Sequence, residues 1–431
     1  KSYSVTSIAG SAFENDKQVT SVSIPESVTS IGDYAFRGCS SMKAINYPPN
    51  CRSGLYAFQG CTGELTLSCN VPQLEINTNP KTYGYFYGSK FTSVIVDENV
   101  TKVGGCAFWN CNTIKSVTLS ETVTTISGRA FYGCSSLSTI NLPNSLVTIG
   151  DYAFYGCSIL TSVNIPNSVT SIGERAFYGC ALTYIELPVG VETVGEFAFA
   201  ASPKLESVII KGNTIELCDG AFFYCPKLTS IDAQISNVAD YLFCGDESLR
   251  FETDDFANVE EIGDYALYNN KSQKIIVGPS VSSLGDKAMA GMNRLTLIDV
   301  SALEERVPQL GENVFEGVSQ SEVTLRVADG TEQAWKSSAQ WNEFKIVDYS
   351  SVVKIDKEKS DIKAWFGEGG LNIQSTDVVR RVSIYASQGI HVATLCPNQT
   401  SAECQINELT EKIYIVVVTT DNQVATFKLI R

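Results

Sequence analysis

A six-residue motif ending in Ala-Phe recurs along most of this chain. It reads IGDYAF at Phe36, ISGRAF at Phe131 and IGERAF at Phe177. Other clear copies end at Phe13, Phe58, Phe108, Phe154, Phe199 and Phe222, and weaker copies end at Phe86, Phe243, Leu267, Met289 and Phe315. Most successive copies lie 21 to 24 residues apart. A fixed period of this length predicts a solenoid, in which stacked units together bury one continuous apolar core.

Each repeat reads as a short strand followed by a turn. In LTSVNIP (160–166), Val163 and Ile165 alternate with Ser162 and Asn164, which is the period of a strand with one buried face. The proline ends this strand because it has no N–H to donate to a ladder. The following SVTSIGERAF completes the coil, and its Ala-Phe pair is expected in the core.

The consensus unit, LxxVxIPxSVTSIGxxAFxGC, resembles the BspA-type leucine-rich repeats of bacterial surface proteins. The resemblance covers about residues 1–347 and is strongest between Phe108 and Phe199. It implies an α/β repeat solenoid, mostly β with short helical turns. It also implies a secreted or cell-surface protein, on the extracellular side of the outer membrane, that adheres to host or matrix proteins.

A closing unit is expected at about 323–347. There a last strand precedes a helix with Thr331 as its N-cap, and Trp335, Trp341 and Phe344 would cover the last coil. Such a cap is needed because the terminal coil of a solenoid otherwise exposes its core to water.

The repeat period disappears beyond the solenoid domain, which is predicted at 1–348. Domain 349–431 instead contains the short apolar runs Val352–Ile355, Leu371–Ile373, Val382–Tyr385, Ile390–Leu395 and Ile413–Val418. Turn signals at Gly369-Gly370, Gln388-Gly389 and Asp421-Asn422 separate runs, so we predict about seven strands in a small β-sandwich. Residues 382–431 resemble the C-terminal sorting domains of type IX secretion substrates. Whether this domain sorts, anchors or spaces the protein stays open.

Composition argues against several classes of function. The formal net charge of −15 disfavours nucleic-acid binding, which needs clustered Lys and Arg. The single histidine, His391, excludes multi-histidine metal sites. The chain has no P-loop, CxxC or GxSxG motif, and no run approaches the ~18 apolar residues of a transmembrane span. We therefore predict no enzymatic activity, no catalytic residue, no cofactor and no metal.

Half of the 14 cysteines recur at one position, three residues after the anchor Phe. This cysteine ladder consists of Cys39, Cys61, Cys111, Cys134, Cys157, Cys180 and Cys225. We interpret it as a column of small buried residues and not as a metal or redox site. Cys396 and Cys404 flank a turn in the C-terminal domain, and the sequence leaves open whether they form a disulfide.

Two surfaces are candidates for binding a partner. The aromatic stripe is formed by the residue after the anchor in five consecutive repeats: Tyr87, Trp109, Tyr132, Tyr155 and Tyr178. Aromatic residues are common at recognition surfaces, but rings at coil spacing also pack on one another, and we favour that structural interpretation.

The second candidate is the outward face of the predicted strands. This strand face consists of Ser116, Thr118, Thr139, Asn141, Ser162, Asn164, Tyr184 and Glu186. Its hydroxyl and amide groups can hydrogen-bond a polypeptide or a glycan, and the concave face of a solenoid is the usual binding face. We predict a monomeric interaction protein that binds a host or matrix protein here, with glycan capture as the alternative.

Overall fold

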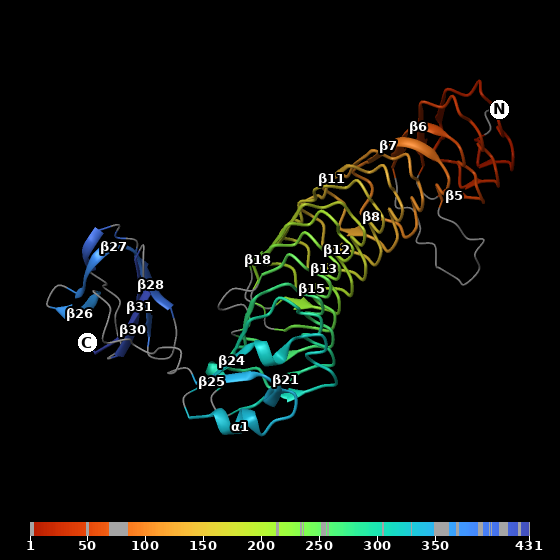
Figure 1. The fold of residues 1–431 in the computed structure, drawn as a ribbon. Coiled ribbons are helices and arrows are strands. Elements are labelled where there is room, and N and C mark those ends of the chain that lie inside the picture. Colours follow the sequence, from red (N-terminus) through yellow and green to blue (C-terminus); the bar gives the residue numbers. More distant parts are fainter. Residues whose placement is uncertain are drawn as a thin grey trace. The chain divides into compact units, whose positions relative to one another are not determined.

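The computed structural model describes residues 4–48, 51–68, 85–212, 215–232, 235, 237–250, 256, 258–303, 306–328, 330–348, 362–367, 370–386, 391–395, 397, 399–404, 413–420 and 424–430. The chain divides into two compact units. The first comprises Lys1–Leu325 and Ala334–Lys345, and the second comprises Arg326–Gln333 and Ile346–Arg431. Figure 1 shows the first unit as a stack of coils and the second as a small group of strands.

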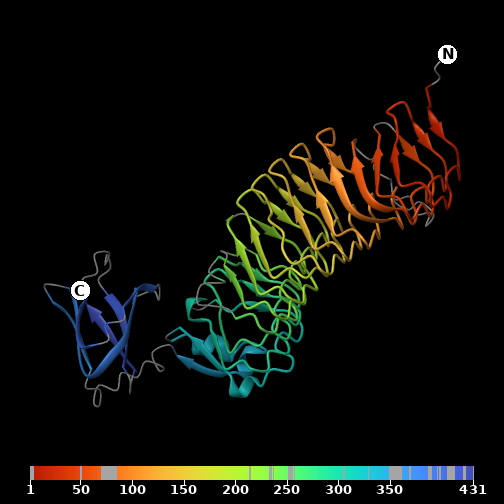
Figure 2. The same ribbon diagram turned by 90° about the horizontal axis from the view of Figure 1, so that it is seen from above.

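The coils carry two rows of parallel strands, which confirms the predicted repeat solenoid. The row of longer strands contains β2 (Ser21–Ser23), β4 (Ala44–Tyr47), β6 (Thr62–Leu67), β7 (Lys90–Val96), β9 (Ser116–Thr118), β11 (Thr139–Asn141), β14 (Tyr184–Leu187), β16 (Ser207–Ile210), β18 (Ser230–Asp232), β20 (Lys274–Ile276), β22 (Leu297–Asp299), β24 (Thr324–Val327) and β25 (Lys345–Asp348). Neighbours pair one coil apart, as where Val117 faces Ile140 between β9 and β11. Figure 2 shows these strands side by side along the coils.

The second row consists of two-residue strands. These are β1 (Ser7–Ile8), β3 (Ser30–Ile31), β5 (Arg52–Ser53), β8 (Lys102–Val103), β10 (Thr125–Ile126), β12 (Thr148–Ile149), β13 (Ser171–Ile172), β15 (Thr193–Val194), β17 (Glu216–Leu217), β19 (Glu261–Ile262), β21 (Ser283–Leu284) and β23 (Gln309–Leu310). From β8 to β17 this row forms one unbroken six-stranded sheet. It therefore runs through coils where the longer row is interrupted.

The strand predicted at 160–166 is not formed. The longer row ends one sheet at β11 and begins the next at β14, and residues 161–166 between them belong to no strand. The side chains still alternate, with Ile165 buried and both Ser162 and Asn164 exposed. The predicted period is therefore present, but segment 161–166 forms no strand in the longer row, although the same coil joins the shorter row through β13.

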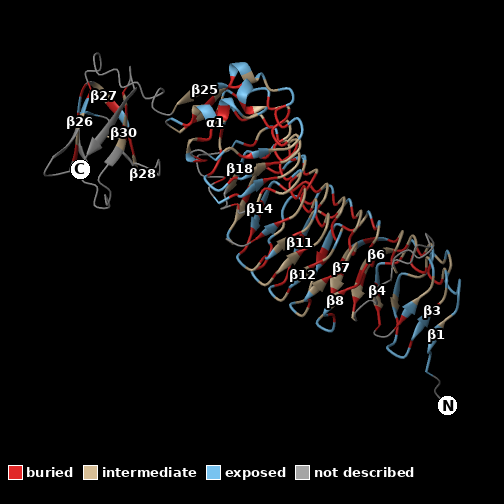
Figure 3. Cartoon of the chain, turned by 90° about the horizontal axis from the view of Figure 1, so that it is seen from below, coloured by how far each residue is buried: buried red, intermediate tan, exposed pale blue. Residues whose placement is uncertain are grey.

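The anchor phenylalanines form a stacked column in the core. Ring centroids lie 5.2 Å apart for Phe108 and Phe131, 5.4 Å for Phe131 and Phe154, and 5.1 Å for Phe154 and Phe177, with interplanar angles of 7° to 11°. Phe154 is completely buried, as the repeat predicts. Burial in Figure 3 follows the same pattern, with core positions recurring in successive coils.

Each coil turns at backbone positions in the left-handed region. One is the residue directly before the Ala-Phe pair, for example Tyr152 (φ 57°) and Arg175 (φ 50°). The other lies two residues after the anchor, where Gly156 has φ 70° and Asn110 has φ 55°. Glycine and asparagine adopt this region most readily, which explains the glycine of the consensus AFxGC.

Short helices and two strands lie within and after the last repeat. They are η1 (Ser301–Leu303), η2 (Gln320–Glu322), α1 (Glu332–Lys336) and η3 (Trp341–Glu343), with β24 and β25 adjacent in one sheet. Trp335 and Trp341 are buried and meet edge to face, with centroids 5.2 Å apart. The Thr331 hydroxyl, directly before α1, donates to the Ala328 carbonyl at 2.8 Å.

The second unit is an antiparallel all-β fold. Its described strands are β26 (Lys363–Gly367), β27 (Gly370–Ala386), β28 (His391–Leu395), β29 (Gln399–Cys404), β30 (Ile413–Thr420) and β31 (Val424–Ile430). The apolar runs at 371–373 and 382–385, predicted as separate strands, are two halves of β27. The run at 352–355 lies outside the described residues. The three predicted turns each separate two strands that pair antiparallel.

Candidate interaction surfaces

The strand face is exposed, and four of its eight residues form one continuous patch. Ser116 and Thr118 on β9 pair in register with Thr139 and Asn141 on β11, and all four side chains are exposed. The residues between them, Val117 and Ile140, point into the core. The alternation places two hydroxyl or amide groups per strand on the outside, as the sequence predicts.

The other four strand-face residues do not belong to the same sheet as this patch. Ser162 and Asn164 are exposed but lie in the coil without a strand, and Tyr184 and Glu186 belong to the next sheet, on β14. Tyr184 is 40% exposed. Its hydroxyl donates to Glu186 Oε2 at 2.6 Å, which raises the pKa of Tyr184.

The aromatic stripe is a self-packed column. Tyr132 and Tyr155 stack with centroids 4.7 Å apart and planes 3° apart, and Tyr155 and Tyr178 stack at 4.9 Å and 5°. Trp109 meets Tyr132 edge to face at 5.6 Å. Burial and the neighbouring tyrosines raise the pKa of Tyr155. Both faces of Tyr155 are therefore covered by neighbouring rings, so that mainly its edge and hydroxyl group can reach the solvent.

The stripe changes character at both ends. Tyr87 meets Tyr56 edge to face at 6.1 Å. After Tyr178 the equivalent position is Ala200, which is buried. Phe223, one coil further on, packs edge to face on Phe197 at 5.7 Å. The parallel stack is therefore limited to three tyrosines.

A second column, which the sequence analysis missed, runs beside the aromatic stripe. Its members directly precede the Ala-Phe pair, and we call Arg129, Tyr152, Arg175 and Phe197 the cation–aromatic stripe. The guanidinium carbon of Arg129 lies 4.5 Å from the Tyr152 centroid. That of Arg175 lies 5.6 Å from Tyr152 and 4.8 Å from Phe197. A positive charge above an aromatic face is attracted by the ring quadrupole, so these coils are joined by cation–π contacts.

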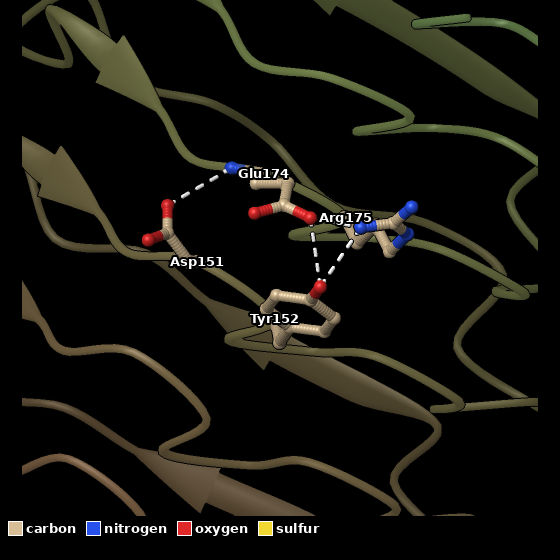
Figure 4. Close-up of polar contacts among 4 residues, drawn as sticks. All are labelled: Asp151, Tyr152, Glu174 and Arg175. Carbon is tan, nitrogen blue, oxygen red and sulfur yellow. Dashed lines mark hydrogen bonds and ion pairs between the residues drawn. The ribbon is translucent and has the colours of Figure 1, made fainter. Parts of the chain in front are cut away.

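Carboxylates complete this arrangement. Figure 4 shows the Tyr152 hydroxyl between Glu174 and Arg175: it donates to Glu174 Oε1 at 2.7 Å and accepts from Arg175 Nη1 at 2.8 Å. Glu174 and Arg175 also form an ion pair. Asp151 Oδ1 accepts the backbone N–H of Glu174 from the next coil at 3.0 Å. The charges of Glu174 and Arg175 are therefore paired with each other within the solenoid.

The aligned repeats do contain a signal for the cation–aromatic stripe. The residue before Ala-Phe reads Arg, Tyr, Arg, Phe in four consecutive repeats. This alternation indicates pairing between neighbouring coils. The predicted aromatic stripe, in contrast, contains only the residues after the anchor.

The cysteine ladder is buried, as predicted, and its thiols are free. Each thiol donates to the backbone carbonyl of an anchor Phe in an earlier coil, at sulfur–oxygen distances between 2.9 and 3.5 Å. Burial raises the pKa of Cys111 and of Cys157 to about 12. The role as hydrogen-bond donor was not predicted. The possible Cys396–Cys404 disulfide lies outside the described side chains.

Chemically, these surfaces offer hydrogen bonds and apolar contacts. Among the described residues, no group of three or more His, Cys, Asp or Glu side chains is arranged to hold a metal ion. In the same part of the chain, no helix has the length and hydropathy needed to cross a membrane.

Comparisons with known proteins agree with this architecture. A family model described as "BspA type Leucine rich repeat region (6 copies)" matches residues 6–83, 81–177, 124–250 and 230–342. A leucine-rich repeat protein from Bacteroides ovatus is 25% identical, with a TM-score of 0.62 over 80% of this chain and 88% of that one. No curated relative matches the chain.

Two further solved structures are similar over parts of their length. A leucine-rich cell surface protein from Faecalibacterium prausnitzii is 22% identical, with a TM-score of 0.38 over 78% of this chain and 86% of that one. A leucine-rich repeat protein from Treponema pallidum is 29% identical, with a TM-score of 0.36 over 39% and 81%. Because the family model spans well over half of the residues, the chain belongs to the BspA-type leucine-rich repeat family.

Proposed function

We propose that this protein is a non-enzymatic interaction protein of the cell surface or the secreted fraction, and that it binds a protein partner through the strand face. One observation carries the proposal. The patch on β9 and β11 is exposed and has polar side chains, whereas the rings of the aromatic stripe are stacked on each other. A host or matrix protein is the proposed partner, and membership of the BspA-type leucine-rich repeat family supports the location.

The strand face also suits a partner of the size that stable complexes need. Such an interface buries about 800 Å² on each side, which is far more than one coil can offer. Parallel strands at a spacing of about 4.8 Å place equivalent polar groups in successive coils, so several coils can contact one extended partner. The exposed Tyr184 adds an aromatic side chain of the type that often dominates binding energy.

The stacking also bears on the glycan alternative. Sugar binding to an aromatic side chain uses the flat face of the ring. In Tyr155 both faces are covered, by Tyr132 on one side and Tyr178 on the other. The aromatic stripe is therefore a poor sugar platform, and we retain the protein partner.

A matched pair of double variants tests the surface. Asn141→Arg with Asn164→Arg places bulk and charge on the strand face, and Asn144→Arg with Asn167→Arg places the same change on exposed turns of the same coils. Binding is measured by surface plasmon resonance to a panel of purified matrix proteins and on a glycan array. We expect the strand-face pair to lose at least tenfold in affinity for a matrix protein and the turn pair to retain it.

Two results would overturn the proposal. Equal binding by the two double variants would show that the partner contacts another surface. Binding on the glycan array alone, with none to the protein panel, would replace the protein partner by a carbohydrate. Thermal unfolding of both variants is the control for retention of the fold.

A further inference from the structure

One position of the cysteine ladder is occupied by an aspartate inside the core. In the coil after Cys225 the residue three places after the anchor Phe243 is Asp246, and it is completely buried. None of the ion pairs in the described part of the chain involves it. An isolated buried carboxylate is very costly, so this site requires either a counter-charge or a proton.

The hydrogen bonds around Asp246 differ from those of the other coils in one respect. In those coils the ladder cysteine donates its backbone N–H to its own anchor, as Cys157 does to Phe154 at 3.1 Å. The N–H of Cys225 donates instead to Asp246 Oδ1, at 2.5 Å. Oδ1 is therefore satisfied as an acceptor, while the buried Oδ2 has no hydrogen-bond partner.

The ladder itself indicates what Oδ2 faces. Each ladder thiol donates to the anchor carbonyl of an earlier coil, as Cys180 does to Phe154 and Cys225 to Phe199. One coil further on, the equivalent acceptor for residue 246 is the carbonyl of Phe222. A carboxylate cannot donate to a carbonyl, but a protonated carboxyl group can.

We infer that Asp246 is protonated in the folded protein and donates Oδ2–H to the Phe222 carbonyl, so that a bound proton joins these two coils. Oδ1 accepts from Cys225 and Oδ2 donates to Phe222, which satisfies both oxygens. Loss of the proton to water leaves a buried charge opposite a carbonyl oxygen and releases the coil. The bound proton thus stabilises the contact between these two coils, and its loss removes that stabilisation.

The groups that face Asp246 are neutral. Cys225 contributes from the preceding coil and Cys244 from the same coil, and burial raises the pKa of both thiols, that of Cys244 to about 12. The following coil contributes Asn270, whose amide donates to the Asp246 backbone carbonyl at 3.0 Å. Burial likewise raises the pKa of Asp246 well above its usual range, in agreement with the geometry.

The sign of the pH dependence follows from proton counting. An unfolded aspartate has a pKa of about 3.9, whereas the folded group keeps its proton to higher pH. Between the two pKa values the folded state binds the additional proton, so stability falls as pH rises. The stabilisation is complete below about pH 4 and is lost as pH approaches the folded pKa.

The test compares Asp246→Asn with the wild-type protein. Asparagine has the shape of the neutral acid, since Oδ1 can accept from Cys225 and Nδ2 can donate to Phe222. Urea unfolding is followed between pH 5 and pH 9. We expect the unfolding constant of the wild type, divided by that of the variant, to rise by up to tenfold per pH unit. Asp151→Asn, a change of the same chemistry at an exposed position, should give a ratio that does not depend on pH.

Infrared spectroscopy provides a second readout that does not depend on unfolding. The wild type at pH 7 should show the carbonyl stretch of a protonated carboxyl group, and Asp246→Asn should lack it. A pH-independent stability ratio for Asp246→Asn would overturn the inference. The absence of the protonated carboxyl band from the wild type would overturn it equally.

Discussion

At the scale of single residues, the repeat places each side chain in a column with its equivalents. A core residue therefore contacts copies of itself in the coils on both sides. The column of anchor phenylalanines shows this most clearly, and the cysteine ladder adds a thiol-to-carbonyl hydrogen bond in each of its coils. A substitution in such a column disturbs three coils at once.

Truncating a central anchor should therefore be costly. Phe154→Ala removes a completely buried ring that stacks on Phe131 and Phe177. Loss of a buried Phe typically costs about 3–5 kcal/mol, because a cavity remains. We expect chemical unfolding to show a loss in this range. A variant with an unchanged unfolding midpoint would contradict the assignment of this residue to the core.

The ladder thiols should be protected from alkylation in the native protein. The thiolate is the reactive form, and burial raises the pKa of Cys157 to about 12, so very little thiolate exists at pH 8. Iodoacetamide labelling followed by peptide mass spectrometry measures each position, and Cys218, which is only partly buried, provides the comparison. Labelling of Cys157 at the rate of Cys218 would show that the ladder is accessible.

At the scale of elements, agreement between sequence and structure depended on how local the signal was. Strands β9 and β11 lie where alternation predicts them. The segment 160–166 has the same alternation but no strand, because a ladder requires the backbones of neighbouring coils to be in reach, and the side-chain period carries no information about that. Similarly, β27 joins two apolar runs into one strand of 17 residues, since its halves pair with different partners.

The stacking within the aromatic stripe should contribute to the stability of the solenoid. Tyr155 stacks on two neighbours, and each aromatic pair is worth about 0.5–1.5 kcal/mol beyond burial. We expect Tyr155→Ala to lower the melting temperature clearly, and Tyr155→Phe, which keeps the ring, to remain close to the wild type. If both variants melt like the wild type but Tyr155→Ala loses binding to a matrix protein, the stripe is a recognition surface after all.

At the scale of the whole molecule, the period alone was sufficient to predict the solenoid. It identified the core column, the buried cysteines and the exposed strand face. It did not identify the cation–aromatic stripe or the carbonyl acceptors of the thiols, because both depend on which side chains meet between coils. The protonated aspartate is harder still to foresee: the sequence shows that Asp246 lies three residues after a weak anchor copy, but only the structure shows its burial and its unpartnered Oδ2.

The predicted division into two domains has a direct test. The buried Trp335 and Trp341 lie beyond the last repeat, and Trp341 packs edge to face on the last anchor, Phe315, at 5.0 Å, so we expect the final coil to be covered without residues 350–431. A truncation after residue 349 should retain the melting temperature of the repeats. A truncation before Thr331, which also removes both tryptophans, should expose the last coil and aggregate. If the repeats fail to fold in the chain truncated after residue 349, the predicted domain boundary is wrong.

The interruption between β11 and β14 also has a mechanical consequence. On one side of the solenoid the hydrogen-bonded ladder stops at coil 161–166, while on the other side the ladder from β8 to β17 passes through the same coil. A load that bends the molecule therefore meets unequal stiffness on its two sides. The interrupted side can lengthen without breaking strand hydrogen bonds, whereas the continuous side acts as the fixed edge of a hinge. We expect this coil to bend more easily towards one side than towards the other when a tethered ligand pulls on the strand face.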